Sequence, residues 1–471
     1  MLDRLTAFER HKRMNPQTPF SSAPVTPLGW AVAQGLASQR QALQRCGVVQ
    51  EVAGTLIRAV GIDAGVGQIC ELRIPTPPRT MLAEVIGVTP GSLLLMPFGH
   101  TQGIGPRTEV VRVDKSQKIP VGPELLGRVI DAFGAPVDGL GPLSCQASAE
   151  VQRTPPQAMK RQIVSRPLVT GVRAIDALNT VGAGQRMGIF APAGVGKSTL
   201  ITMLVKGSSA AVNVVALVGE RGREVREFVE HALGPAGLAR ACVVVATSDA
   251  PPGERVRAAL TATTIAEYFR DQGLDVTLVV DSLTRFARAQ REIGLACGEP
   301  PTRRGFTPSV FAALPSLLER AGPSEHGSIT GFYTILNEDD ESADPIGEEV
   351  RSIVDGHLVL SRKLSERGQF PAIDVLASLS RLMSNLVDPT HAALARKLRS
   401  LLSKHQEIEL LLQLGEYRPG FDRLSDEAVG KIDAIRAFLA QGSEDNAPVQ
   451  KTLSWLQQIV DSELPTVQAP L

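Results

Sequence analysis

The chain has 471 residues, a length that predicts roughly two to four domains. Apolar residues make up 43% and charged residues 21% of the sequence, so several sizeable cores are possible. The 49 basic residues balance 49 acidic ones. This neutrality argues against binding dominated by attraction to nucleic acid or anionic membrane, although a local basic patch is compatible with it.

The cysteines favour a reducing compartment. They are Cys46, Cys70, Cys145, Cys242 and Cys297. Their number is odd, they are widely scattered and they form no C-x-x-C pair, a pattern typical of buried thiols and not of a disulfide framework or zinc site. The sequence has no run of about 18 apolar residues, so it predicts no membrane span. Asp3, Glu9 and the polar stretch after them argue against a secretory signal, so we expect a cytoplasmic protein.

Residues 1–46 are expected to form a linker and a short helix that serve oligomerisation or partner binding. Residues 15–28 are polar and proline-rich, as in a flexible linker. The apolar residues that then fall near helical spacing are Leu28, Val32, Leu36 and Leu43. Packing of this helix on its own domain is at least as good an interpretation as packing on a partner.

Residues 47–120 predict a small all-β domain, most simply a barrel. Short β-rich runs are separated there by Gly, Pro and Asp. The runs are GTLIRAVGI (54–62), QICELRI (68–74), MLAEVIGV (81–88) and SLLLMPF (92–98). We find no catalytic constellation in this region.

Residues 121–386 predict an α/β domain with a parallel sheet, because continuous apolar runs typical of strands buried on both faces alternate with helical stretches such as 253–273. The strand-like runs are MGIFA (187–191), VNVVALVG (212–219), ACVVVATS (241–248), DVTLVVD (275–281), GSITGFYTILN (327–337) and GHLVLSR (356–362). Beyond residue 387 the strands stop, and helical periodicity over 393–417, 426–441 and 449–460 predicts a C-terminal helical domain, 387–471.

The stretch APAGVGKST (191–199) nearly fits the phosphate-binding pattern G-x-x-x-x-G-K-[ST], with Ala191 in place of the first glycine. It follows a predicted strand and precedes a predicted helix, which is the context that the motif requires. Lys197 would reach the β- and γ-phosphates and Ser198 would bind Mg²⁺. The residues expected to contact nucleotide here are Ala193, Gly194, Val195, Gly196, Lys197, Ser198 and Thr199. The alternative is a chance glycine loop with an exposed lysine.

Two carboxylates follow apolar strands and complete the predicted site. Asp281 ends TLVVD and could hold Mg²⁺ through water, although it could also cap the next helix. Glu220 ends another strand, at the sheet edge where ligands bind, and is the expected base that polarises the attacking water. Arg221 could contact the γ-phosphate. Glu224 and Glu227 are alternative bases, but their helical context favours solvation.

Longer motifs resemble one family, the ATPase of type III secretion systems, which is similar to the catalytic subunit of rotary ATP synthases. The motifs are VGERGREVREF (218–228), DAPPGERVRAALTATTIAEYFRDQG (249–273), DSLTRFARAQREIGLACGEPPTRRGFTPSVFAALPSLLERAG (281–322) and DGHLVLSRKLSERGQFPAIDVLASLSR (355–381). The resemblance covers about residues 50–465. It implies a β-barrel, a RecA-like nucleotide domain and a C-terminal helical domain.

The resemblance also implies roles for single residues. It supports Lys197 and Glu220 as catalytic and Asp281 as the magnesium aspartate. Arg381 matches an arginine finger that a neighbouring subunit inserts, where local sequence alone indicates a surface arginine. Phe370 matches an aromatic that stacks on adenine, where local sequence alone indicates core. The acidic loop 337–345 matches a region facing a central stalk.

The implied protein is a homohexameric ATPase that uses ATP and Mg²⁺ to energise protein unfolding and export. The implied partners are a central stalk, peripheral stator proteins and chaperone–effector complexes, with the ATPase peripheral at the cytoplasmic face of the inner membrane. FARAQ, GEPPTRRG and QICELR favour the injectisome branch, whereas LMPFG is more typical of flagellar export.

Three other functions remain as alternatives. A rotary synthase head subunit is disfavoured because DRLSDEAVG (422–430) stands where such subunits carry an acidic tract. A non-catalytic nucleotide-binding subunit is disfavoured by the presence of Lys197, Glu220 and Arg381. A RecA-type nucleic-acid motor is disfavoured by neutral charge and only 4% aromatic residues, which give no stacking platform.

Overall fold

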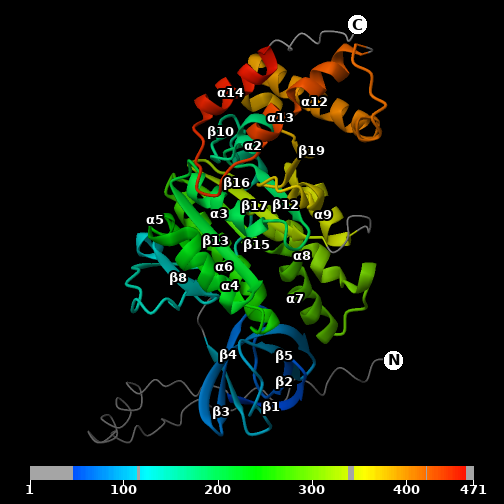
Figure 1. Cartoon of the computed structure of the whole chain (residues 1–471). Helices are drawn as coiled ribbons and strands as arrows, with labels where there is room; N and C mark the ends of the chain where they lie inside the picture. The colour runs from blue at the N-terminus through cyan, green and yellow to red at the C-terminus, as the bar shows by residue number, and fades with distance from the viewer. Residues whose placement is uncertain (1–45, 114–116, 338–343, 421, 463–471) are drawn as a thin grey trace, which may run out of the picture. The chain divides into compact units, whose positions relative to one another are not determined.

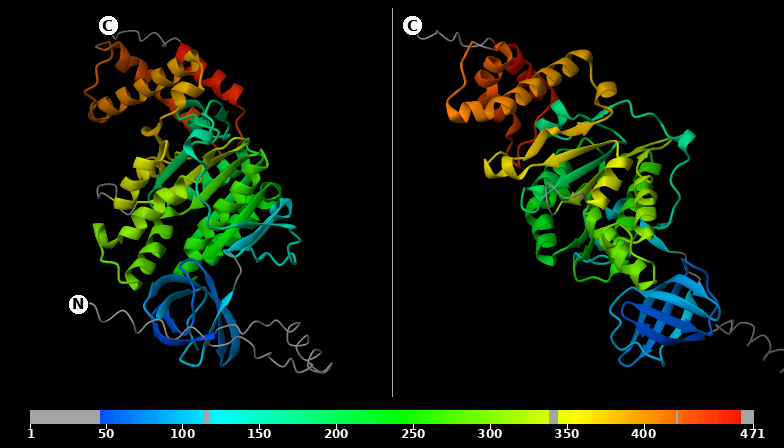
Figure 2. Two further views of the ribbon diagram at one scale, coloured as in Figure 1. Left: turned by 180° about the vertical axis from the view of Figure 1, so that it is seen from behind. Right: turned by 90° about the vertical axis from the view of Figure 1, so that its right-hand side faces the viewer.

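The computed structural model describes residues 46–113, 117–337, 344–420 and 422–462. The predicted linker and helix of residues 1–46 lie outside this part, apart from Cys46 at the start of the first strand, as does most of the acidic loop 337–345. Figures 1 and 2 show the described chain as a small barrel, an α/β region and a group of C-terminal helices. The predicted fold class is confirmed, while the residues predicted as domain boundaries stay a prediction.

The N-terminal barrel is closed and antiparallel, and it is drawn in blue in Figure 1. Its strands, in spatial order, are β1 (Cys46–Ala53), β2 (Leu56–Val60), β5 (Ser92–Pro97), β4 (Pro78–Thr89), β3 (Ile69–Pro75) and β6 (Glu109–Val113). Alternate residues such as Leu72 and Ile74 point inward and are buried, as the period of a strand requires. The four predicted runs form β2 to β5, and the unpredicted β1 and β6 close the barrel.

The central sheet has nine strands. Its order is β19 (Ile373–Ser380), β18 (Gly356–Leu360), β12 (Arg186–Ala191), β17 (Ser328–Leu336), β15 (Asp275–Asp281), β13 (Val212–Glu220), β14 (Ala241–Thr247) and β8 (Arg128–Asp131), with β16 (Gly322–Pro323) beside β17. The strands from β18 to β8 pair in parallel, as predicted. The edge strand β19 and the two-residue β16 pair antiparallel with their neighbours. Two further two-stranded sheets pair β7 (Lys118–Val121) with β9 (Ala147–Glu150) and β10 (Pro167–Leu168) with β11 (Val181–Gly182).

Helices cover both faces of the sheet. The helices of the α/β region are α2 (Arg173–Leu178), α3 (Lys197–Gly207), α4 (Gly222–Glu227), α5 (Gly234–Leu238), α6 (Pro252–Asp271), α7 (Leu283–Ala296), α8 (Pro308–Leu318), α9 (Pro345–Ile353) and α10 (Arg362–Glu366). The C-terminal helices are α11 (Met383–Leu386), α12 (Pro389–Leu414), α13 (Arg423–Leu439) and α14 (Val449–Asp461). Among the described helices, none is long and apolar enough to cross a membrane.

The strand β13 separates two hydrophobic cores because its side chains alternate between the faces. Val214 and Val218 join the core formed with α6, α7 and α8. Val215 and Leu217 join the core formed with α2 and α3. Residues of the C-terminal helices, including Phe438, belong to this second core. The C-terminal helical region therefore packs on the same face of the sheet as the phosphate-loop helix α3.

Candidate active site

The phosphate loop connects β12 to α3 and has the backbone that its glycines allow. Gly194 and Gly196 adopt φ values of 80° and 89°, in the left-handed region that favours glycine. Val195 between them is buried and anchors the loop in the core. Ala191 is fully buried as the last residue of β12 and lies outside that left-handed region. The position occupied by Ala191 therefore does not require a glycine.

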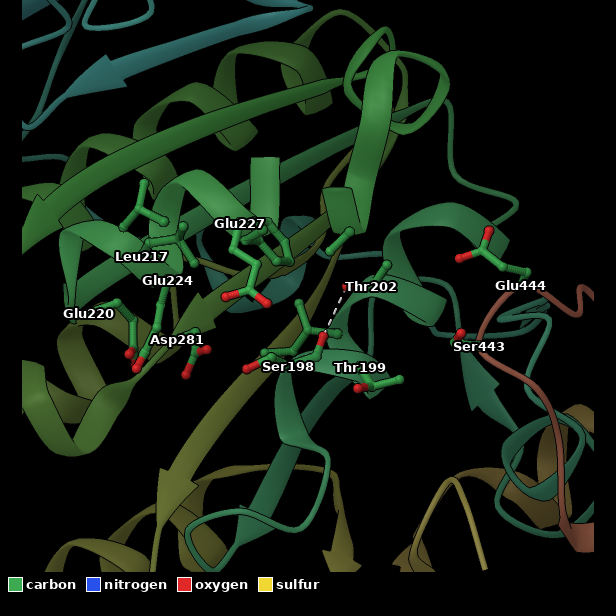
Figure 3. Close-up of a pocket in the computed structure, with 14 residues that line it drawn as sticks. Ser198, Thr199, Thr202, Leu217, Glu220, Glu224, Glu227, Asp281, Ser443 and Glu444 are labelled. Atoms are coloured by element: carbon green, nitrogen blue, oxygen red, sulfur yellow. Dashed lines mark hydrogen bonds between the residues drawn. The ribbon is translucent and has the colours of Figure 1, made fainter. Parts of the chain in front are cut away.

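Lysine and carboxylates from three elements meet at the carboxyl edge of the sheet. Glu220 is the last residue of β13 and Asp281 the last of β15, and these two strands are neighbours. Lys197, the first residue of α3, donates a hydrogen bond to Asp281 Oδ1, and its Nζ lies 3.6 Å from Glu220 Oε1. Figure 3 shows Glu220 and Asp281 side by side, with Glu224 next to them. The edge thus collects the groups that the sequence predicted, as expected for a parallel sheet.

Glu220 is a buried carboxylate with one oxygen that takes part in no hydrogen bond among the described residues. The residue is 7% exposed, and its Oε1 has no hydrogen-bond partner among the described residues. The other oxygen, Oε2, lies 3.3 Å from the guanidinium of Arg285, which also donates to Gly219 O. Burial raises the pKa of Glu220, and Asp281 adds to this rise, while Lys197 and Arg285 oppose it.

The neighbouring Asp281 is fixed from both sides. It is 3% exposed, and besides the bond from Lys197 it accepts a hydrogen bond of 2.7 Å from Thr334 Oγ1 on β17. The alternative sequence interpretation, in which Asp281 caps the next helix, is wrong. The cap of α7 is Ser282, whose hydroxyl accepts from Arg285 N, so the side chain of Asp281 is left for the site.

A pocket of about 350 Å³ opens beside these groups (Figure 3). Its polar lining residues are Ser198, Thr199, Thr202, Glu220, Glu224, Glu227, Asp281, Ser443 and Glu444. Sequence reasoning expected Glu224 and Glu227 to be solvated. Glu224 is half-buried and Glu227 exposed, and both face this pocket. Ser443 and Glu444 were not predicted, since they lie in an acidic turn after α13 without any recognisable motif.

Arg221, Arg381 and Phe370 lie outside the pocket lining, as do residues 193–197 of the phosphate loop. The side chain of Arg221 is 73% exposed and pairs with Glu224 at 3.1 Å. Arg381 follows β19, is exposed and donates to Arg351 O at 3.2 Å. Phe370 is 43% exposed and lies beside the phosphate loop: a Cβ on Gly196 would be 3.5 Å from its ring.

The residues of the site fit a nucleotide better than an all-protein metal centre. Within the described ranges, no cluster of three or more His, Cys, Asp or Glu could hold a metal ion. The oxygens of Ser198 and Asp281 do face the pocket. Mg²⁺ is typically held by one or two protein oxygens together with substrate phosphates and water, so these two side chains suit a metal that arrives with its nucleotide.

Comparison with known proteins agrees with this geometry. The nucleotide-binding domain of the ATP synthase alpha/beta family matches residues 171–380, and the beta-barrel domain of the same family matches 49–114. The T3SS EscN ATPase C-terminal domain matches 387–458.

Two relatives and one solved structure span most of the chain. The Type 3 secretion system ATPase of Xanthomonas euvesicatoria is 54% identical over 89% of this chain and 95% of its own length. The Flagellum-specific ATP synthase of Bacillus subtilis (strain 168) is 48% identical over 89% and 96%. The structure of the assembled ATPase EscN from the enteropathogenic E. coli type III secretion system is 46% identical, with a TM-score of 0.84, and covers 88% of this chain and 100% of that one.

Fold, site and similarity together define a P-loop ATPase with the architecture of the ATP synthase alpha/beta family. Within that class, the chain belongs to the type 3 secretion system ATPases, to which the flagellum-specific ATP synthases are close.

A substitution at Gly219 tests whether ATP turnover depends on the position of Glu220. Gly219 adopts φ 71°, and an added Cβ would lie 2.9 Å from Arg285 Cδ. Gly219→Ala should therefore displace Arg285 and Glu220 and lower the rate of ATP turnover by roughly tenfold or more. Gly222→Ala is the matched control, because a Cβ there would meet only Thr247, at 4.0 Å. Steady-state turnover of both variants, with folding checked by circular dichroism, measures the difference, and equal activity would contradict the positioning.

Proposed function

We propose that this ATPase hydrolyses Mg²⁺-bound ATP to energise the unfolding and export of proteins through a type III secretion system. The observation that carries the proposal is the meeting of Lys197, Glu220 and Asp281 at one edge of the sheet. A half-buried lysine between two carboxylates suits a site that exchanges its internal ion pairs for phosphate and magnesium. The relatives named for type 3 secretion support the use of the energy for export.

Binding of ATP is assigned to the phosphate loop. The main chain of residues 193–197 surrounds the phosphates, and Lys197 neutralises their charge. Ser198 would hold Mg²⁺ directly and Asp281 would hold it through water. When bound, the metal supplies charge neutralisation for the phosphate oxygens. Phe370, exposed beside Gly196, would stack on the adenine.

Activation of water is assigned to Glu220. Its Oε1 lies 3.6 Å from Lys197 Nζ and has no hydrogen-bond partner among the described residues, so it can accept a hydrogen bond from the attacking water. Arg285 holds the other carboxylate oxygen and so fixes the orientation of the acceptor. Glu224 lines the same pocket, but it pairs with Arg221 and is the weaker candidate. Arg221 would contact the γ-phosphate once released from this pair.

Arg381 is assigned to the site of a neighbouring subunit. It is exposed and lies outside the pocket lining of its own chain, which suits a residue that acts across an interface. We therefore propose a homohexamer. The similar EscN structure is that of an assembled ATPase, which supports this proposal. A second solved structure, at 45% identity and a TM-score of 0.82, is that of assembled EscN in complex with its central stalk EscO.

The wider setting is part of the same proposal. We propose that a central stalk, stator proteins and chaperone–effector complexes bind the hexamer, and that the hexamer sits peripherally at the inner membrane. Flagellar export is the second candidate, because flagellum-specific relatives reach 48% identity. The injectisome is favoured by the match of residues 387–458 to the T3SS EscN C-terminal domain.

Lys197 and Glu220 should separate binding from turnover. Lys197→Ala should weaken ATP binding and abolish turnover, because the lysine neutralises phosphate charge in the ground state. Glu220→Gln should abolish turnover but retain binding, because it acts on the water. Calorimetric titration of ATP and steady-state phosphate release measure the two effects. Equal loss of ATP affinity in both variants would remove the role assigned to Glu220.

Arg381 should act in trans. An arginine finger contributes about 10³–10⁵ in rate, so Arg381→Ala should be nearly inactive but still bind ATP. Lys197→Ala keeps its finger and can offer it to the intact loop of an Arg381→Ala neighbour. Mixing the two inactive variants should therefore restore measurable hydrolysis, below the wild-type rate because only some interfaces are complete.

Two controls define that experiment. The double variant Lys197→Ala/Arg381→Ala should never complement, and Arg396→Ala, which removes another exposed arginine, should retain wild-type turnover. Near wild-type turnover by Arg381→Ala alone would show that the finger is assigned wrongly.

A further inference from the structure

A buried glutamine joins the C-terminal helices to the nucleotide region. Gln441 lies two residues past the end of α13 and is 6% exposed. Its amide makes three hydrogen bonds, which occupy the oxygen and both N–H groups. Oε1 accepts from Arg173 N at 2.9 Å, and Nε2 donates to Gly171 O and Asp445 O, each at 2.7 Å. A side chain so fully bonded fixes the loop that carries it.

The main chain of the same residue holds Phe370. The N–H of Gln441 donates to Phe370 O at 2.7 Å. The ring of Phe370 lies beside Gly196 of the phosphate loop, because a Cβ added to that glycine would lie 3.5 Å from the ring. Gln441 thus connects the start of the nucleotide domain, at Gly171 and Arg173, to the aromatic ring that flanks the phosphate loop.

The loop that Gln441 fixes also reaches the pocket. Ser443 and Glu444 line it, and Glu444 pairs with Lys206 near the end of α3 at 3.0 Å. The loop after α13 packs closely against Gly171. This glycine has φ 74°, and a Cβ there would lie 2.3 Å from Asn446 Oδ1. Figure 3 shows Ser443 and Glu444 on the opposite side of Ser198 and Thr199 from Glu220 and Asp281. This segment therefore borders the pocket away from the catalytic carboxylates.

We propose that Gln441 is a positioning residue for the nucleotide base. It holds the main chain of Phe370 and the segment 443–445 in place, so that the base side of the site is preformed while the phosphates are bound by other elements. The inference rests on the proposed function, in which Phe370 stacks on adenine. Base stacking depends on a fixed ring, whereas phosphate binding by the loop and Lys197 does not involve Gln441.

Gln441→Met tests this separation in the full-length chain. Methionine conserves the volume but removes all three side-chain hydrogen bonds, and it leaves their partners to find water. We expect the affinity for Mg-ATP to fall about tenfold, the size of a lost stacking contact, and the affinity for inorganic tripolyphosphate to change by less than about twofold. In turnover, KM for ATP should rise by about the same factor as the affinity falls, with kcat nearly unchanged.

Two matched variants complete the calorimetric titrations. Gln457→Met makes the same substitution at an exposed position of α14 and should bind both ligands as the wild type does. Phe370→Ala should reproduce the selective loss of ATP affinity, because it removes the ring itself.

Three outcomes separate a failure of this inference from a failure of the proposed base contact. Equal loss of ATP and tripolyphosphate in Gln441→Met would show a merely structural role and overturn the inference. If Gln441→Met binds ATP as the wild type does while Phe370→Ala selectively loses ATP affinity, the inference is overturned. The proposed contact between Phe370 and the base is then still supported. Wild-type ATP affinity in Phe370→Ala would refute the base contact itself, and the inference would fail with it.

Discussion

The site depends on two cationic side chains that offset the negative charge of two buried carboxylates. Glu220 and Asp281 end adjacent parallel strands, and their mutual repulsion in this buried edge is offset by Lys197 and Arg285. Lys197 is bound to Asp281 and lies near Glu220, whereas Arg285 remains with Glu220 through the oxygen that faces away from the lysine. Under the proposed function, Lys197 would turn to phosphate while Glu220 keeps a cation beside it. This division of roles would let one sheet edge bind an anion and retain a base.

The C-terminal helices belong to this arrangement and are not an appendage. They share a hydrophobic core with α2 and α3, and the segment after α13 borders the pocket through Ser443 and Glu444. The packing of Phe438 on Trp455, with Arg173 over the same indole at 5.0 Å, holds that segment against the nucleotide domain. The helical region therefore contributes to the pocket through residues other than Glu220 and Asp281.

The parts of the site that sequence could predict are those set by local rules. Continuous apolar strands ending in Glu220 and Asp281 place both carboxylates at one edge, because parallel strands share that edge. The cap of α7 was missed because Asp281 and Ser282 are adjacent and both residue types cap helices. Only the structure shows that the Ser282 side chain accepts the capping hydrogen bond. Gln441 and Glu444 were missed because tertiary packing, and no periodicity or motif, brings their segment to a loop far away in the sequence.

The central claim is that each site is complete only when a neighbouring chain supplies Arg381. It is tested most directly by ATP turnover per chain measured across a protein dilution series, with the mass of the complexes determined at each concentration. The account predicts that turnover per chain rises in proportion to the fraction of assembled chains and approaches zero for the monomer. A constant turnover per chain from monomer to assembled ring would contradict it.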